Sequence, residues 1–441
     1  MEHAQPSYSW LDRALAYGPF VLLLFGPVAF GAVEPWSIFT LEAGAALLFV
    51  LWAVRQTMPD QPELLGNPLF LPILAFAALI LLQWTAGLTA YRYATRSQAV
   101  LYCAYGLLCF VVVQGLRRTR QVRALAITLS VYGSALALFA LVQSLISNGK
   151  LYWLRTPRFG GWIYGPYVNH NHYAGLMEML VPIPLVFALT NYARGPRKRL
   201  AALAAAIMAT TIFLSGSRGG MLAFTVEMCV LATILIKRRT TQRAAWALGV
   251  FMVIVVGLLI WLGGGELTQR LASIDTETRK ELSGGMRVAI DRDGLRMFAH
   301  KPVLGWGLGT FVDVYPRFRS FYSDLVVDQA HNDYLQLLTE TGAIGFLIVI
   351  WYVAVLYRKA AQRLGNWPRD TNGAVALAAM LGGTGILVHS FVDFNLQIPA
   401  NAAIFYVLCV VAAMESRFGT YRRRHTVAHD AMELGAPEIG P

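Results

Sequence analysis

The chain has 441 residues, of which 56% are apolar and only 14% are charged, and its mean hydropathy is positive. Soluble domains carry about 25% charged residues, so this composition excludes an ordinary soluble protein and indicates a polytopic membrane protein. The formal net charge of +12 does not indicate a nucleic-acid partner, because the Lys and Arg residues lie in short clusters between apolar segments, where they set orientation in a bilayer.

About twelve apolar segments approach the roughly 20 residues that a helix needs to cross a membrane. They lie at approximately 17–33, 36–55, 68–87, 97–115, 122–147, 172–191, 199–215, 219–236, 244–262, 335–357, 374–394 and 399–415. We therefore expect an all-α polytopic membrane protein. Its predicted parts are an N-terminal transmembrane bundle over 1–262, a polar loop over 263–334, C-terminal transmembrane helices over 335–415 and a tail over 416–441. We expect no cleavable signal, because the first ten residues are polar and lack a basic region.

The basic clusters fall in alternate connectors between the apolar segments. They lie near 117–123, 194–199, 237–243, 358–369 and 417–424. Because Lys and Arg are enriched in short cytoplasmic loops, all these connectors are predicted to be cytoplasmic. Both termini are then cytoplasmic as well, and the other connectors, with the polar loop over 263–334, face the outside.

The polar loop is the only long polar interval between apolar segments. Arg287 to Phe298 has the pattern of a short helix, which ends before Pro302. The following GWGLG segment is expected to form a flexible turn. A second helix is expected from Asp328 and continues into the next apolar segment.

An amide-rich segment, GPYVNHNHYAG over 165–175, lies at the outer mouth of the sixth apolar segment, in a loop that also carries Arg158. Its Asn169, His170 and Asn171, together with Arg158, are candidates for binding a substrate. The neighbouring Gly and Pro suit a backbone that approaches a ligand closely. The alternative is that these side chains only cap the helix and form hydrogen bonds at the membrane surface.

Two arginines are candidates for binding an anion. Arg218, in SGSRGG, lies between apolar segments, where a cation is costly unless it has an anionic partner or reaches water. Its planar guanidinium matches phosphate oxygens, although it is also able to extend to lipid headgroups. Arg287 with GWGLG is a second candidate anion clamp, and the alternative is a solvated side chain.

Histidines supply the candidate proton-transfer groups. His331, in AHNDY, titrates near neutrality and suits a general base, although a lone histidine beside a helix start is more often structural. His389 and Asp393 have i,i+4 spacing on one expected helix face. Either the carboxylate orients the imidazole for a substrate, or the two groups simply satisfy each other.

Two arginines, a histidine and an amide-rich mouth on one side suggest a consistent chemistry if the substrate is a lipid pyrophosphate. The arginines would offset the charge of the departing pyrophosphate, and the histidine would deprotonate the incoming hydroxyl. No metal or other cofactor is expected, because the outer loops contain no Asp-x-Asp pair and the chain shows no zinc-like His/Cys spacing. The four cysteines lie inside apolar segments without CxxC spacing, so no disulfide is expected either.

These motifs resemble the signature of the O-antigen ligase and O-antigen polymerase superfamily. The resemblance lies in SGSRGG, KPVLGWGLGTF and AHNDYLQLLTETGAIGF, and GPYVNHNHYAG is similar to the family's upstream Asn-rich motif. By this match, Arg218 and Arg287 correspond to the pyrophosphate-contacting arginines and His331 to the proposed catalytic base. Arg292 and Arg296 lie on the same short helix as Arg287.

The resemblance implies a GT-C-type integral membrane glycosyltransferase of the bacterial inner membrane, with its active site in a helical periplasmic loop. Such an enzyme takes a glycan from undecaprenyl pyrophosphate and transfers it to a hydroxyl on lipid A core or on another lipid-linked glycan. Ligase and polymerase share these motifs, so the sequence does not separate them, and it does not give the sugar, the anomeric outcome or the oligomeric state.

Two other classes of function compete with this interpretation. A transporter or flippase of lipid-linked glycans or anionic solutes would suit about twelve spans, but transporters commonly show internal repeats and a site at the midplane. Here the candidate groups gather at one face of the membrane. An assembly partner without activity would leave the arginines and the histidine unexplained.

Overall fold

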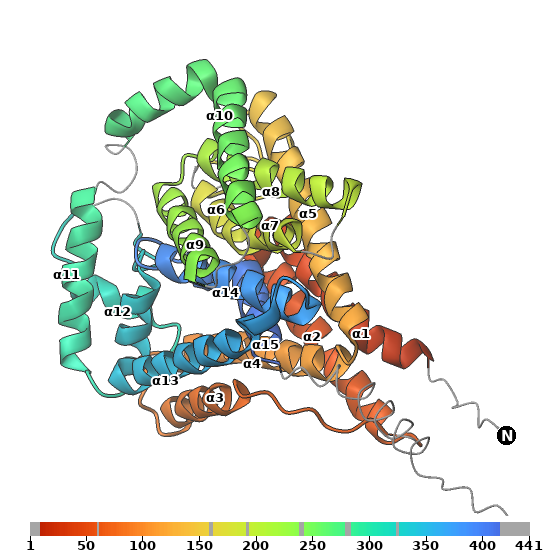
Figure 1. The fold of residues 1–441 in the computed structure, drawn as a ribbon. Helices are drawn as coiled ribbons and strands as arrows, with labels where there is room; N and C mark the ends of the chain where they lie inside the picture. Colours follow the sequence, from red (N-terminus) through yellow and green to blue (C-terminus); the bar gives the residue numbers. More distant parts are fainter. Residues whose placement is uncertain are drawn as a thin grey trace, which may run out of the picture.

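The computed structural model describes residues 9–59, 61–157, 162–190, 194–237, 242–277, 284–322 and 326–414. Over these ranges the chain is helical and forms no β-strand, which confirms the all-α prediction. The helices are α1 (Ser9–Val28), α2 (Pro35–Gln56), α3 (Phe70–Thr85), α4 (Arg92–Gly115), α5 (Thr119–Leu145), α6 (His170–Leu180), α7 (Pro182–Leu189), α8 (Pro196–Leu214), α9 (Arg218–Lys237), α10 (Gln242–Glu277), α11 (Gly284–His300), α12 (Phe311–Val314), α13 (Asp333–Arg363), α14 (Thr371–His389) and α15 (Pro399–Ala413) (Figure 1).

Each predicted apolar segment coincides with one helix, except that 172–191 forms the pair α6 and α7. Within the described ranges, nine helical stretches are long and apolar enough to cross a membrane, α6 and α7 together counting as one. Helices α3 and α15 are shorter apolar helices, and α8, whose first turn carries Arg197, Lys198 and Arg199, is not among the nine. The described part of the chain is therefore all-helical and has nine candidate membrane spans, and the count of about twelve stays a prediction.

Helix α14 lies at the centre of the bundle and packs against α5, α6, α7, α9, α13 and α15. In the candidate spans, the buried share is 94% for α6 with α7 and 78% for α14, against 22% for α2 and 17% for Ala245–Leu262 of α10. Large apolar side chains such as Trp246, Val253 and Trp261 are exposed on α10. A bilayer would cover this apolar surface, so the peripheral helices are those that would face lipid.

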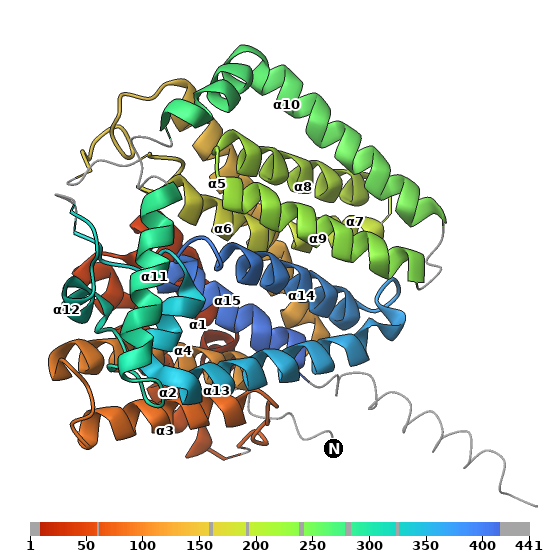
Figure 2. The same ribbon diagram turned by 90° about the vertical axis from the view of Figure 1, so that its left-hand side faces the viewer.

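The polar interval after residue 262 begins as a continuation of α10 rather than as a loop. The helix runs for 36 residues, which at 1.5 Å per residue is about 54 Å, longer than the roughly 30 Å hydrocarbon core. Helices α11 and α12 follow it, and Figure 2 shows both at the end of the bundle opposite the C-terminal ends of α9 and α13. The division of the chain at 262 and 263 stays a prediction.

Two predicted basic connectors lie together at that opposite end. Arg363, at the end of α13, donates from Nη1 to the carbonyls of Val411 and Ala412 at the end of α15. Asn372, near the start of α14, donates to Thr119 at the start of α5. The clusters near 117–123 and 358–369 therefore share one end of the bundle, as a common membrane face requires, while the orientation in the membrane stays a prediction.

Helix α11 confirms the predicted short helix, but the helix that enters α13 begins at Asp333, not at Asp328. Two local features explain why α13 begins later in the sequence than predicted. His331 has a φ of +54°, which is outside the right-handed helical region. Asn332 is the N-cap, and its side chain accepts a hydrogen bond from the Leu335 amide at 3.1 Å.

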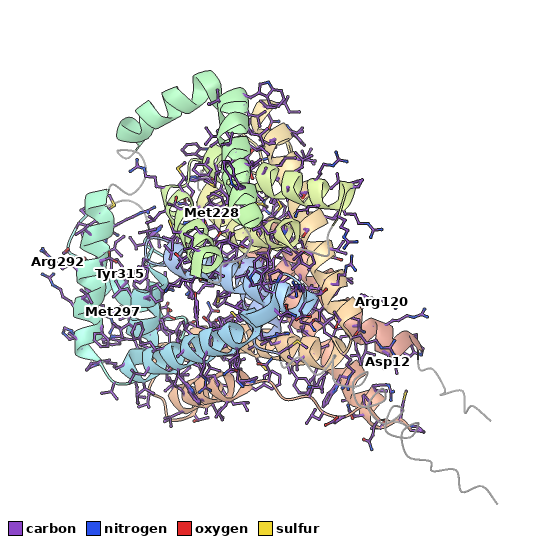
Figure 3. The ribbon with its side chains drawn as sticks, viewed as in Figure 1. Asp12, Arg120, Met228, Arg292, Met297 and Tyr315 are labelled. Carbon is purple, nitrogen blue, oxygen red and sulfur yellow. The ribbon has the colours of Figure 1, made fainter. Side chains whose placement is uncertain are left out.

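A second, smaller core joins α11 to α12. It contains Ile290 and Met297 from α11 with Phe311 and Tyr315 from α12 and its continuation. Figure 3 shows Met297 and Tyr315 on the inner side of α11, whereas Arg292 points away from the bundle. One face of α11 is therefore packed against the rest of the protein. This packing sets the side of α11 from which the Arg287 side chain extends.

The segment around GWGLG is a packed strap, so the prediction of a flexible turn is wrong. Helix α13 is interrupted at Gly342, where φ is +65° and ψ is −170°. The strap pairs with the interrupted helix: the Trp306 amide donates to the Thr339 carbonyl at 3.0 Å, and the Ala343 amide donates to the Pro302 carbonyl at 2.8 Å. Its backbone groups are thus satisfied inside the protein rather than by water or a ligand.

Two buried side chains hold the strap in place. Gln83 of α3 donates to the carbonyls of Leu304 and Glu340 at 2.6 and 2.9 Å. The Glu340 carboxylate accepts hydrogen bonds from the amides of Gly309 and Phe311 at 2.8 and 3.2 Å. The strap therefore carries hydrogen bonds that position α11 and α12, and its role as an anion clamp stays a prediction.

We expect Gly342→Ala to destabilise the protein. A Cβ at this position would lie 2.3 Å from the Val303 carbonyl oxygen, and the backbone occupies a region that is almost exclusive to glycine. The free energy of unfolding should fall by about 2 kcal/mol or more, seen as a lower unfolding temperature of the detergent-solubilised protein. The matched control is Gly249→Ala, because a Cβ there would meet nothing within 4 Å. Equal unfolding temperatures for the two variants would contradict the packed strap.

Candidate active site

The loop between α14 and α15, residues 390–398, is the point where the predicted site residues meet. Asp333, the first residue of α13, forms several hydrogen bonds to this loop. Its amide donates to the Ser390 carbonyl at 2.9 Å, and its carboxylate accepts from the Ser390 hydroxyl at 2.8 Å and the Leu396 amide at 3.1 Å. This network sets the start of α13, with His331 two residues before it, against the α14–α15 loop.

His331 has the properties that a general base needs. Its ring lies edge-on to Phe394 with 4.9 Å between centroids, and its Nδ1 is buried without a hydrogen-bond partner among the described residues. Burial lowers the pKa of His331; the charges of Arg287 and His172 lower it further, and Asp393 opposes them. The imidazole is therefore neutral near pH 7, with a nitrogen available to accept a proton.

Asp393 is paired with His172, not with His389. Helix α14 ends at His389 and a turn follows, so the predicted i,i+4 pair on one helix face is wrong. The Asp393 carboxylate lies 3.7 Å from His172 Nε2, while His389 Nδ1 lies 2.9 Å from Oε1 of Glu178. Burial alone would raise the pKa of Asp393, but the contact with His172 and the charges of His172, His389 and His331 hold it below its ordinary value.

Phe394 brings the two histidines of the site together. His172 lies edge-on to the same ring as His331, with 4.7 Å between centroids. The charge of Asp393 acts on both His331 and His172. The α14–α15 loop thus supplies the Phe394 ring and the Asp393 carboxylate. Both lie beside His172 and His331, which come from distant parts of the chain.

Arg287 reaches this loop from α11. Its Nη1 donates to the Val392 carbonyl at 3.1 Å, whereas its Nε is buried and has no hydrogen-bond partner in the described part of the chain. Its charge acts on His331 and on Asp291. Burial raises the pKa of Asp291, and a hydrogen bond with Asn332 and the charge of Arg287 lower it in part. The guanidinium is therefore held beside His331 with donor capacity left for a ligand.

Arg218 begins α9, and its side chain is exposed. The next residue packs on the same loop: a Cβ on Gly219 would lie 2.5 Å from Cδ2 of His389 and 2.9 Å from a methyl of Val392. Val392 thus contacts the start of α9 with its side chain and Arg287 with its carbonyl. The first-turn amides of a helix carry partial positive charge, which adds to an arginine at that position.

Two residues of the amide-rich segment make different contacts: Asn169 lies beside His172 of the site, and His170 bonds to another turn of the bundle. Asn169 is the N-cap of α6, which agrees with the alternative prediction that these side chains cap the helix. Its Nδ2 lies 3.4 Å from Nε2 of His172. His170 bonds through Nδ1 to the Ser215 carbonyl at 2.9 Å and stacks on Trp162. His170 therefore joins α6 to the SGSRGG turn. Asn171 is buried.

One predicted residue, Arg158, lies outside the described residues. Others that form the site were not singled out by sequence. His172 lies in the amide-rich motif and Asp333 lies in AHNDY, so each is a neighbour of a residue that the sequence analysis did predict for the site. Glu178 is a carboxylate inside an apolar segment, which is itself a signal, because such groups are costly in a membrane. The sequence carries no comparable signal for Phe394.

The comparison with protein families indicates the family to which part of the chain is similar. Residues 203–350 match the family model described as O-antigen ligase. This stretch is therefore similar to the O-antigen ligases. This confirms the predicted relationship to the O-antigen ligase and polymerase superfamily, and the family implies an enzyme that joins or polymerises lipid-linked glycans at a membrane. The curated proteins include no match to the chain.

The matched stretch contains Arg218, Arg287 and His331, but it ends before the α14–α15 loop. The loop residues that contact them therefore lie outside the matched stretch. Their assignment to the site rests on the contacts described above.

Proposed function

We propose that the protein is a glycosyltransferase that moves or polymerises a glycan from undecaprenyl pyrophosphate onto an acceptor hydroxyl. The observation that carries this proposal is the convergence of Arg287, His331 and the start of α9 on one loop. Following the basic connectors, the site faces the periplasm from the inner membrane, and both termini are cytoplasmic. The acceptor is lipid A core or a second lipid-linked glycan, and no metal or cofactor takes part.

The arginines bind the pyrophosphate in this proposal. Arg287 offers its buried, unpartnered Nε, and Arg218 is accessible at the N-terminal end of α9. As the bond between the anomeric carbon and the pyrophosphate oxygen breaks, negative charge grows on that oxygen. Guanidinium groups fixed where charge develops stabilise the transition state more than the ground state.

His331 activates the acceptor. The acceptor oxygen forms its bond to the anomeric carbon, and the hydroxyl proton moves to Nδ1 of His331, whose ring orientation Phe394 and the α13 start define. Asn169, His170 and Asn171 at the mouth of α6, with His389 and Asp393 in or beside the α14–α15 loop, are the proposed substrate-binding groups. The role of Arg158 in this set stays a prediction.

Transfer should depend on pH through His331. Because burial lowers its pKa, the rate should fall only when the pH drops below about 6.5. Asp393 favours the charged imidazole, so Asp393→Asn lowers the pKa of His331 further and should move this acid limb to lower pH, by about one unit or less. Rates between pH 5 and 8 measure the shift. The control Asp313→Asn, at an exposed carboxylate, should leave the limb in place, and a shift of the Asp393→Asn limb to higher pH would contradict the assignment.

The function itself is tested in cells. A deletion strain is complemented with the wild-type gene or with Arg218→Ala, Arg287→Ala or His331→Ala. The proposal expects long-chain glycan only from the wild type, with each variant inserted and expressed normally. Accumulated donor then identifies the reaction: full-length lipid-linked glycan indicates a ligase, and single repeat units indicate a polymerase. Normal long-chain glycan from all three variants would refute the proposal.

A further inference from the structure

A buried pair of ionisable groups lies directly beside this site, and the mechanism above gives neither group a role in proton transfer. Glu178 of α6 is 0% exposed and His389 at the end of α14 is 1% exposed. His389 Nδ1 lies 2.9 Å from Oε1 of Glu178. Both residues lie outside the stretch matched by the family, and both are buried where an isolated charge would be costly.

The pair lies under the first turn of α9. A Cβ on Gly219 would be 2.6 Å from Nε2 of His389, and a Cβ on Gly220 would be 3.0 Å from Oε1 of Glu178. Because Gly219 and Gly220 have no side chain, the first turn of α9 packs directly against the imidazole of His389 and the carboxylate of Glu178. The Nε2 edge of His389 faces the same helix start that carries Arg218, which is where the proposed function places the pyrophosphate.

Burial disfavours the charged form of His389, and carboxylates from three elements oppose this effect. Glu178 approaches from α6, Asp393 from the α14–α15 loop and Asp333 from the start of α13. On the fourth side is α9, with Arg218 at its first position. A carboxylate that accepts the Nδ1 hydrogen fixes the tautomer, orients the ring and stabilises the imidazolium, as in carboxylate–histidine pairs of hydrolases.

We propose that His389, oriented by Glu178, is the proton donor to the departing pyrophosphate; this inference rests on the proposed function. When the bond from the anomeric carbon to the pyrophosphate oxygen breaks, its electron pair stays on that oxygen, and the proton on Nε2 of His389 moves to it. His331 takes up the acceptor's proton in the same turnover. One proton is delivered and one is accepted, so the site ends with the same total charge.

The test is the alkaline side of the pH profile of transfer. Wild-type protein should lose activity as His389 loses its proton. Glu178→Gln removes the carboxylate that favours the imidazolium, so its alkaline limb should shift to lower pH while the acid limb, set by His331, stays in place. His389→Gln should reduce transfer about a hundredfold or more and remove the alkaline limb.

Glu227→Gln is the matched control. Glu227 is a buried carboxylate of α9 whose two oxygens have no hydrogen-bond partner within the described ranges, and its charge is not among those acting on His389. Its replacement should leave both limbs in place. Folding of each variant is checked by its unfolding temperature, and if Glu178→Gln does not fold, His389→Asn supplies the same test of the alkaline limb.

Two results would overturn the inference without touching the proposed function. One is a uniform loss of rate in Glu178→Gln at every pH, which would make the pair structural. The other is an unchanged alkaline limb in the His389 variants. Failure of the proposed function looks different, because the wild-type protein would then form no glycosidic bond from the lipid-linked donor at any pH.

Discussion

His331→Asn is expected to reduce glycan transfer by at least about a hundredfold while the protein stays folded. The reason is the Nδ1 atom, which is buried, lacks a hydrogen-bond partner among the described residues and belongs to an imidazole that burial keeps neutral. Asparagine is the suitable replacement, because it tolerates the φ of +54° at this position better than alanine or glutamine. The measurement is the rate of transfer at saturating donor and acceptor.

His300→Gln is the control for this experiment. His300 ends α11, is exposed, and bonds through Nδ1 to the Arg296 carbonyl. Its replacement should leave the rate within about twofold of wild type, since exposed side chains away from the site change little. If His331→Asn retained wild-type activity at pH 7, another group would have to accept the proton, and the assignment of the base would be wrong.

Arg218→Ala is the second substitution with a large expected effect, again a loss of about a hundredfold or more. Its side chain is exposed at the N-terminal end of α9, so alanine should insert and fold normally, and the loss would report on the anion rather than on stability. Arg218→Lys keeps the charge but loses the planar fork, and it should recover only part of the rate. Steady-state rates at several donor concentrations separate donor binding from the chemical step.

The matched control is Arg317→Ala. Arg317 is an exposed arginine that follows α12 in the same polar interval, and its loss should leave transfer unchanged. A wild-type rate for Arg218→Ala, or an equal loss in both arginine variants, would contradict a specific role for Arg218 in binding pyrophosphate.

The helices were predictable because their signal is local. A segment of about 20 apolar residues specifies a helix by its own length and hydropathy. Each apolar segment coincides with a helix or, at 172–191, with a pair broken by Pro182 and Pro184. The short helix α11 was predictable for the same reason, since Pro302 marks its end.

Features that depend on distant contacts were not predictable. The continuation of α10 through Glu277 crosses a polar segment that reads as a loop. The interruption of α13 at Gly342 makes sense only with the strap against it. The strap's glycines suggested flexibility, but Gln83, far away in sequence, holds it in place.

The candidate site shows the same division. Motif residues such as Arg287 and His331 were identified from residue type and position, and in the structure both contact the α14–α15 loop. The partner of each ionisable group was not identified, because the spacing of His389 and Asp393 suggested a pair on one helix. The end of α14 at His389 separates them, and Glu178 and His172, more than 200 residues earlier, are the actual partners.

The most direct test of the account uses purified protein in liposomes, with a labelled glycan on undecaprenyl pyrophosphate, a lipid A core or lipid-linked glycan acceptor, and no nucleotide sugar. The account predicts that wild-type protein forms a glycosidic bond and releases one undecaprenyl pyrophosphate per bond, whereas Arg218→Ala and His331→Asn protein does neither. Wild-type protein that carries the lipid-linked glycan across the bilayer without forming a bond would contradict it and identify a transporter instead.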